Sequence, residues 1–227
     1  MDTTQFWLAS LEIIVINLLL SGDNAVVIAL ACRNLPGRQR TWGVVVGAAG
    51  AVVLRVVLTA FAVQLLGLPW LKLVGGALLL WIGVKLVAED AHDEGADPKV
   101  VASDRLWTAV RTVVVADLVM SVDNVLGVAA AAKGSVPLLV FGLLLSIPLV
   151  VAGSQVILRL IERFPILILA GGGLLGWIAG EMIVEDEALA PWIDANAGWL
   201  EWSLPVAGVA LVIAVAKWME RHRAAAQ

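Results

Sequence analysis

The chain has 227 residues, of which 61% are hydrophobic and 15% charged, and its mean hydropathy is +0.95. A soluble domain carries about 25% charged residues, so this composition excludes an ordinary soluble protein and indicates an integral membrane protein. The net charge of -4 and the pI of about 5.1 argue against a nucleic-acid partner. A single cysteine, Cys32, excludes an internal disulfide and a thiolate metal cluster.

The apolar runs predict seven membrane-spanning helices, because a helix needs roughly 20 mainly apolar residues to cross a bilayer. The N-terminal run has no basic segment before it and no small-residue cleavage site, so we expect a retained span and not a signal peptide. Pro36 and Gly37 separate the first two spans, and Pro148 is expected to kink the fifth. The predicted spans are 6–32, 42–66, 69–89, 106–132, 136–159, 165–185 and 203–219.

The distribution of basic residues predicts the orientation of these spans. Most of the Lys and Arg residues fall in the loops after spans one, three and five and in the C-terminal tail. Cytoplasmic loops are enriched in such residues, so we expect the N-terminus outside and the C-terminus in the cytoplasm of a bacterial-type inner (plasma) membrane. Tryptophans near the span ends would form aromatic belts: Trp7, Trp42, Trp70, Trp107, Trp202 and Trp218.

Two segments of the sequence occur twice in the same order. SGDN at Ser21–Asn24 returns as SVDN at Ser121–Asn124, and GGALLLWIGVKLVAED at Gly75–Asp90 returns as GGGLLGWIAGEMIVED at Gly171–Asp186. Spans one to three therefore repeat as spans four to six, and because three is odd the second unit is inverted in the membrane, as in many secondary transporters. The paired glycines in these segments predict close approach of helices.

The predicted fold class is an all-α membrane protein with seven transmembrane helices, in which an inverted-topology repeat of three plus three helices is followed by one extra C-terminal helix. We divide the chain into a first three-helix repeat, an acidic cytoplasmic loop, a second and inverted repeat, an acidic outer loop, and a seventh helix with a basic tail. These segments are 1–90, 91–104, 105–186, 187–202 and 203–227.

Polar residues inside spans one and four form a candidate metal site. A lone carboxylate at the membrane centre costs at least ~2.5–3.5 kcal/mol, so Asp23 and Asp123 indicate a functional site. Unwinding at Gly22 could turn Asp23 toward the other polar side chains. Oxygen ligands suit Mg²⁺, Ca²⁺ and Mn²⁺. The alternative is that the Asn and Ser side chains only bridge helices. The candidate ligands are Asn17, Ser21, Asp23, Asn24, Asp117, Ser121, Asp123 and Asn124.

Three further charges lie inside the predicted spans. Arg55 needs a carboxylate partner, with which it could neutralise the acidic site, repel a second cation or form a purely structural ion pair. Lys85 and Glu181 occupy equivalent repeat positions with opposite charge. They could pair with each other, or Lys85 could extend to the cytoplasmic interface. The acidic loops on both sides are either vestibules that attract cations or simply solvated surface.

The SGDN and SVDN motifs, together with the GG…WIG…ED spans, resemble the TerC family of integral membrane proteins and its YjbE-type branch over nearly the whole chain. The resemblance implies metal-ion transport, since several members are implicated in Mn²⁺ export. In manganese-exporting relatives an acid also precedes each motif aspartate by six positions; Asp117 fits this pattern and Asn17 departs from it. The residues that match the family motif are Asp23, Asn24, Asp123 and Asn124.

These features predict a secondary-type transporter, not an enzyme, that exports a divalent cation, most readily Mn²⁺, by alternating access. Its partners would be the metal ion and the lipid bilayer, without a cofactor or nucleic acid, and a homo-oligomer is left open. One alternative is an intramembrane aspartyl protease, in which two acids share a proton. Another is a non-transporting membrane partner that helps to load metal into exported proteins.

Overall fold

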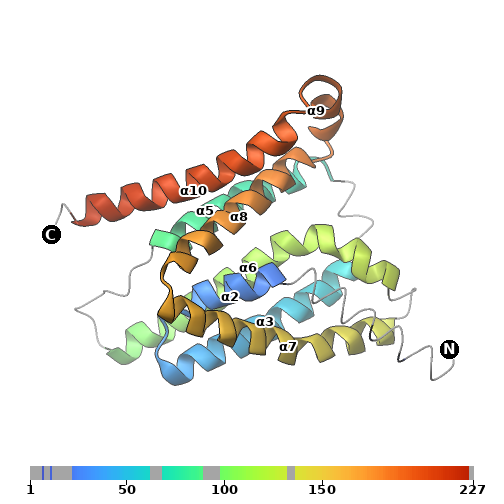
Figure 1. Cartoon of the computed structure of the whole chain (residues 1–227). Coiled ribbons are helices and arrows are strands. Elements are labelled where there is room, and N and C mark those ends of the chain that lie inside the picture. The colour runs from blue at the N-terminus through green and yellow to red at the C-terminus, as the bar shows by residue number, and fades with distance from the viewer. Residues whose placement is uncertain are drawn as a thin grey trace. The chain divides into compact units, whose positions relative to one another are not determined.

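Every regular element in the described part of the chain is a helix (Figure 1). The structure is a computed structural model, and it describes residues 7, 11, 22–61, 68–88, 98–131 and 136–224. The all-α fold class is confirmed for these residues. The helices are α2 (Gly22–Cys32), α3 (Gly37–Ala60), α5 (Leu71–Ala88), α6 (Pro98–Ala131), α7 (Val136–Arg163), α8 (Ile166–Val184), α9 (Ala190–Asn196) and α10 (Leu200–Ala224).

Five helices of the described part are long and apolar enough to cross a membrane: α3, α5, α7, α8 and α10. α2 is apolar but has 11 residues, and the chain before Gly22 in the predicted first span lies almost entirely outside the described residues. α6 has 34 residues and covers nearly all of the predicted fourth span. Seven spans therefore remain a prediction, whereas five apolar helices long enough to span a membrane are observed.

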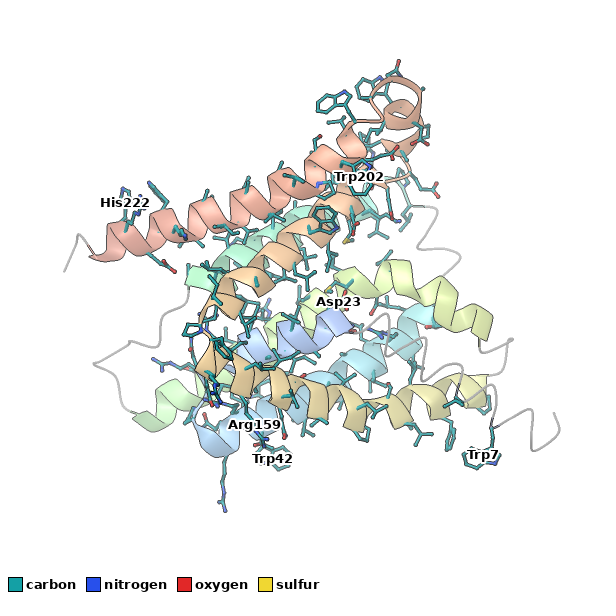
Figure 2. The ribbon with its side chains drawn as sticks, in the orientation of Figure 1. Trp7, Asp23, Trp42, Arg159, Trp202 and His222 are labelled. Carbon is teal, nitrogen blue, oxygen red and sulfur yellow. The ribbon has the colours of Figure 1, made fainter. Side chains whose placement is uncertain are left out.

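The tryptophans near helix ends have exposed side chains, as membrane-interface anchors would. Trp42 lies near the start of α3, and Trp202 lies near the start of α10 (Figure 2). Trp218 lies near the other end of α10. Apolar side chains such as Val53 and Leu149 are exposed between such ends. Exposed aliphatic side chains on long helices are expected where helices contact lipid, because apolar surface is unfavourable in water but not in a hydrocarbon environment.

The helices form two compact units. The first comprises Met1–Gln64 and Gly95–Arg159, and the second comprises Leu65–Glu94 and Leu160–Gln227. The first unit holds α2, α3, α6 and nearly all of α7, and the second holds α5, α8, α9 and α10. Each unit thus combines helices from both predicted repeats, and the division of the sequence into two inverted halves remains a prediction.

In the first unit, α6 packs against both α2 and α3 (Figure 1). Small residues allow this approach: a Cβ atom on Gly47 of α3 would lie 3.1 Å from Cγ1 of Val113 on α6. The turn between α2 and α3 is closed by Arg40, whose guanidinium donates to the main-chain carbonyls of Arg33 at 3.1 Å and Leu35 at 3.3 Å. A cation at a helix C-terminus satisfies carbonyls that lack partners within the helix.

In the second unit, α8 packs against both α5 and α10, and the contact with α5 is reciprocal. A Cβ atom on Gly76 of α5 would lie 2.8 Å from Cγ1 of Ile183 on α8, and one on Gly172 of α8 would overlap Val87 on α5. Gly76 matches Gly172 in the sequence repeat, and Val87 matches Ile183. The two helices therefore meet through equivalent residues, as a local twofold produces. The predicted close approach is confirmed at both glycines.

The N-terminus of α5 is capped by a carboxylate from a distant part of the chain. Asp186, which is fully buried, accepts hydrogen bonds from the main-chain N–H groups of Trp70 at 3.1 Å, Leu73 at 3.0 Å and Ala188 at 3.0 Å. Trp70 has a φ of 70°, a left-handed conformation that costs a non-glycine residue energy. The carboxylate of Asp186 is therefore buried although α8 has already ended, because these N–H donors draw it inward.

Replacing Asp186 by Asn is expected to lower the free energy of unfolding by about 1–2 kcal/mol, because the charged cap of α5 is lost. Thermal unfolding in detergent, followed by tryptophan fluorescence, would measure this change. The exposed Asp194→Asn serves as a control that should shift stability by less than about 0.5 kcal/mol. Equal stability of the Asp186 variant and the wild type would contradict the capping role.

The same cap predicts a pH dependence. Burial alone would raise the pKa of Asp186, but the N–H donors of Ala188, Leu73 and Trp70 outweigh it and lower that pKa below the ordinary carboxyl value. A carboxyl group whose pKa is lower in the folded state stabilises the fold above its unfolded pKa of about 3.9. The advantage of the wild type over Asp186→Asn should therefore be complete at neutral pH and decline as the pH falls through the lower, folded pKa.

Candidate functional site

A cavity of about 20 Å³ lies inside the first unit. Its wall is mostly aliphatic, but three helices each contribute one polar side chain: Asn24 from α2, Arg55 from α3 and Asp117 from α6. Ile147 and Val150 of α7 line another part of the wall. Roughly 10–15 Å³ is enough for one water molecule, so the cavity is of the size of a single water or a dehydrated metal ion.

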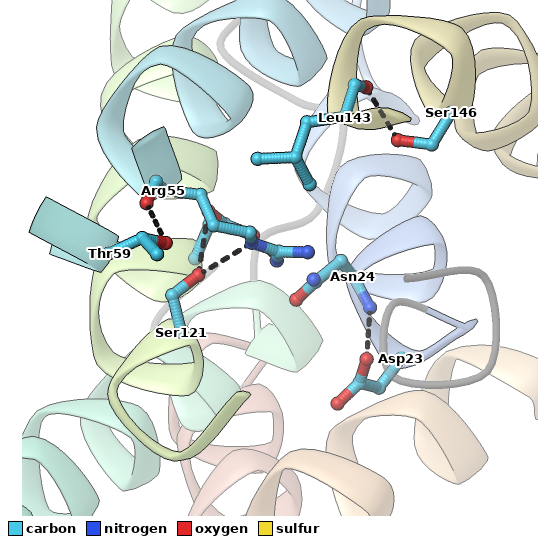
Figure 3. A network of polar contacts seen from close by, with 8 residues as sticks. Asp23, Asn24, Arg55, Thr59, Ser121, Leu143 and Ser146 are labelled. Atoms are coloured by element: carbon cyan, nitrogen blue, oxygen red, sulfur yellow. Dashed lines mark hydrogen bonds and ion pairs between the residues drawn. The ribbon is translucent and has the colours of Figure 1, made fainter. Parts of the chain in front are cut away.

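Arg55, Asp117 and Ser121 form a closed ring of hydrogen bonds beside the cavity. Figure 3 shows the bond between Arg55 and Ser121. Arg55 Nη2 donates to Asp117 Oδ1 at 2.6 Å, and Arg55 Nε donates to Ser121 Oγ at 3.1 Å. The Ser121 hydroxyl in turn donates to Asp117 Oδ2 at 3.1 Å. All three residues are at most 3% exposed. Arg55 thus has the carboxylate partner that its position inside a span required, and both oxygens of Asp117 are engaged.

Asn24 is the polar group of the cavity that this ring leaves out. Its side chain is buried, and neither its Oδ1 nor its Nδ2 has a hydrogen-bond partner in the described part of the chain. Buried polar groups are nearly always hydrogen-bonded, and leaving one unpaired costs about 1–3 kcal/mol. The guanidinium of Arg55 points toward Asn24 (Figure 3). An amide kept unpaired beside a cavity is therefore a candidate ligand group.

Asp23 is half-buried at the start of α2, next to Asn24. Its Oδ1 accepts a hydrogen bond from the main-chain N–H of Asn24 at 2.8 Å, and a carboxylate in a first helical turn also interacts favourably with the helix dipole. Asp23 interacts electrostatically with both Arg55 and Asp117. The first motif thus adds a second carboxylate to the surroundings of the cavity, while the predicted unwinding at Gly22 remains a prediction.

The structure places residues of both motif helices, Asn24 on α2 and Asp117 and Ser121 on α6, within one buried cluster in the first unit. Among the side chains it describes, no three of the types His, Cys, Asp and Glu are grouped so that they could hold a metal ion. Asp123 and Asn124 belong to α6, but their side chains lie outside the described set, as do the whole of Asn17 and Ser21. Their role as ligands remains a prediction.

Sequence reasoning missed the contribution of α7. Ile147 and Val150 line the cavity, and the nearby Ser146 and Ser154 are buried. Each serine hydroxyl donates to a main-chain carbonyl of its own helix, at 2.7 Å and 2.8 Å respectively. Such bonds to the carbonyl of the preceding turn let a serine hydroxyl be satisfied inside an apolar helix. A polar residue in the predicted fifth span was the available signal, but nothing in its spacing indicated which neighbour it faced.

A second, larger hollow lies in the second unit and is acidic. Its volume is about 470 Å³, and the edges of Trp177 and Trp202 meet there with ring centroids 6.4 Å apart. Glu185, which lines the hollow, is paired with Lys72, whose Nζ lies 3.1 Å from its Oε2. Elsewhere in this unit, Nζ of Lys85 lies 5.5 Å from the ring centroid of Trp81. Part of the predicted acidic outer loop thus helps to line this hollow. The acidic residues that line the hollow are Glu181, Glu185, Asp194 and Glu201.

Comparison with known proteins agrees with the motifs. Residues 2–224 match the family described as "Integral membrane protein TerC family". The chain belongs to the TerC family. The family resemblance expected from the SGDN and SVDN motifs is confirmed, and the protein is an integral, multi-pass membrane protein with several apolar helices.

Relatives of this TerC-family protein are bacterial membrane proteins. It is 45% identical over 208 residues to "Uncharacterized membrane protein YjbE" of Bacillus subtilis (strain 168), covering 91% of this chain and 93% of that protein. It is 31% identical over 177 residues to "Uncharacterized membrane protein YceF" of the same organism, covering 75% and 68%. The "UPF0053 inner membrane protein YgdQ" of Escherichia coli (strain K12) is 27% identical over 135 residues, 53% and 56% of the two chains. No solved structure is significantly similar.

Proposed function

We propose that this TerC-family protein is a secondary transporter that exports a divalent metal cation, with Mn²⁺ as the favoured cargo, by alternating access. The observation that carries the proposal is the buried cluster in the first unit. There the unpaired amide of Asn24 and the Asp117–Arg55 pair line one cavity, and the two motif helices contribute one residue each. Ionisable and polar groups inside membrane segments mark ion pathways far more often than structural contacts.

The chemistry of the cluster favours a hard divalent cation. Its candidate donors are carboxylate, amide and hydroxyl oxygens, which suit Mn²⁺, Mg²⁺ and Ca²⁺ better than Zn²⁺ or Cu⁺. Asp23 and Asp117 together carry the two negative charges that a divalent ion needs. Because the cavity is small and its wall is mostly aliphatic, an ion that enters it would exchange part of its hydration shell for these oxygens.

The acidic hollow of the second unit supports a role in the handling of cations. Four carboxylates line it, and a wall of one sign of charge raises the local concentration of cations. With the N-terminus outside, as the basic loops predict, the loop between α8 and α10 faces the exterior. In that orientation the hollow would be a cation-attracting surface on the outer side of the membrane.

The two alternative functions fit the cluster less well. An intramembrane aspartyl protease needs two carboxyl groups that share a proton, whereas both oxygens of Asp117 bond Arg55 and Ser121. A non-transporting partner in metalloprotein maturation would not need an unpaired amide beside a buried ion pair. Co-purification with a secretion complex, in the absence of ion flux, would favour that third function.

Asn24→Leu is expected to reduce Mn²⁺ flux at least about tenfold without loss of stability. Leu has nearly the shape of Asn, so the substitution removes a ligand oxygen without leaving a large cavity. It also removes an unpaired buried polar group that destabilises the fold by about 1–3 kcal/mol. Loss of activity with unchanged or increased stability is the signature of a residue kept for function. Flux would be measured in proteoliposomes with an Mn²⁺-quenched dye, and stability by thermal unfolding.

The matched control is Ser154→Ala, which changes a buried polar residue outside the cavity wall and should leave flux unchanged. Wild-type protein that carries no Mn²⁺ or other divalent cation across the membrane would overturn the proposal. Flux that is equal in wild type and Asn24→Leu would show that the cavity is not the ion site.

A further inference from the structure

We propose that Arg55 is a built-in counter-ion that a metal cation must displace from Asp117, so that cation binding is an exchange of one positive charge for another. This inference rests on the proposed transport function and adds the step by which the site opens. It follows from the hydrogen bonds that already occupy Asp117. Its Oδ1 accepts a hydrogen bond from Arg55 Nη2, and its Oδ2 accepts one from the Ser121 hydroxyl. A cation can use Asp117 fully only when the guanidinium withdraws.

A guanidinium is a permanent cation, whereas the amine of a lysine can become neutral when it is buried. The exchange therefore requires movement of the side chain within a buried cluster whose members are at most 5% exposed: Arg55, Asp117, Ser121 and Asn24. The guanidinium points toward the unpaired Asn24 side chain (Figure 3). Its withdrawal would free an oxygen of Asp117 in the same cavity that Asn24 lines.

The electrostatic balance explains why such a counter-ion is useful. With Arg55 in place, Asp117 is neutralised, and Asp23, which interacts electrostatically with both residues, supplies a further negative charge beside the cluster. An incoming divalent cation beside a fixed Arg55 would be repelled, whereas after the exchange Asp23 and Asp117 together balance its charge. When the ion leaves, Arg55 returns and no unpaired carboxylate stays buried, which would otherwise be strongly unfavourable. The ion-free protein can then change conformation readily.

The experiment compares Mn²⁺ binding with Mn²⁺ transport in Arg55→Gln, using purified protein in lipid nanodiscs for binding and proteoliposomes for flux. Gln removes the competing charge but keeps a hydrogen-bonding group. Loss of one charge-assisted hydrogen bond predicts binding about 10- to 100-fold tighter. Turnover should fall at least about tenfold, since the ion-free carboxylate is left unpaired and the bound ion leaves slowly. Both KM and kcat therefore decrease.

Two further variants keep the proposal testable if Arg55→Gln folds poorly. Arg55→Lys retains a positive charge and should bind Mn²⁺ with an affinity between those of the wild type and Arg55→Gln. The double variant Arg55→Gln/Asp117→Asn is isoelectric with the wild type and should lose the tightened binding, because Asp117 is the group that the arginine releases.

The results separate this inference from the proposed function. Wild-type flux with Mn²⁺ affinity that is unchanged or weaker in both Arg55→Gln and Arg55→Lys would overturn the exchange and leave the transport function standing. Wild-type protein without Mn²⁺ binding or flux would overturn both. A purely structural arginine predicts weaker binding in every Arg55 variant, opposite in sign to the exchange.

Discussion

Asp117→Asn is expected to reduce Mn²⁺ flux by about 100-fold or more and to destabilise the protein by about 3–5 kcal/mol. The substitution removes a carboxylate oxygen from the proposed ion site. It also leaves Arg55, which is 3% exposed, as an uncompensated positive charge beside the cavity. A fixed cation at that place repels the ion that the site should bind, so loss of the ligand and electrostatic repulsion act in the same direction.

Flux in proteoliposomes and thermal unfolding of the same preparation would measure both effects. Adding Arg55→Gln to Asp117→Asn removes the stranded charge, and the double variant should regain most of the lost stability while its flux stays low. Comparison of the single and double variants therefore separates the effect of this residue pair on stability from its effect on transport. Near-normal flux in Asp117→Asn would exclude Asp117 from the ion path.

Gly176→Ala is expected to destabilise the packing of α8 against α10 by about 3 kcal/mol, at the upper end of what overpacking produces. A Cβ atom on Gly176 would overlap the main chain of Gly208, and a Cβ atom on Gly208 would overlap that of Gly176. A side chain in such a contact could change its rotamer, but two helical backbones can separate only if the helices move apart. Every other contact between α8 and α10 would then weaken.

Thermal unfolding followed by tryptophan fluorescence would measure the effect of Gly176→Ala. Gly153→Ala is the matched control in α7, since its Cβ atom would lie 3.8 Å from Cβ of Ala25, an ordinary contact. Ala is favoured over Gly in a helix by about 1 kcal/mol, so the control should be as stable as the wild type or more stable. An unchanged unfolding temperature in Gly176→Ala would contradict the close approach of the two helices.

The helices and their tight contacts were predictable because they follow from local patterns. Apolar runs predicted the spans, and the repeated paired glycines predicted a close approach of helices, which Gly76 and Gly172 show between α5 and α8. α9 was expected to be part of a loop, because a seven-residue helix is too short to show a clear period. The buried Asp186 was also unpredictable, since its partners at Trp70 and Leu73 lie more than 110 positions away.

The candidate site was predictable in composition but not in pairing. The sequence identified Asn24, Asp117 and Ser121 as polar residues of the motif spans and showed that Arg55 needs a carboxylate. Which carboxylate it contacts depends on the packing of α3 against α6, and no sequence spacing specifies that. The unpaired amide of Asn24 was equally hidden, because an absent hydrogen bond is a property of the assembled neighbours.

The most direct test of the account is a structure determined with Mn²⁺, in which anomalous scattering locates the ion. We expect a single strong peak in the cavity, in contact with Asn24 and Asp117, and the Arg55 guanidinium turned away from the carboxylate. Mn²⁺ found only in the acidic hollow of the second unit, or no bound ion while Arg55 still contacts Asp117 at saturating Mn²⁺, would contradict the account.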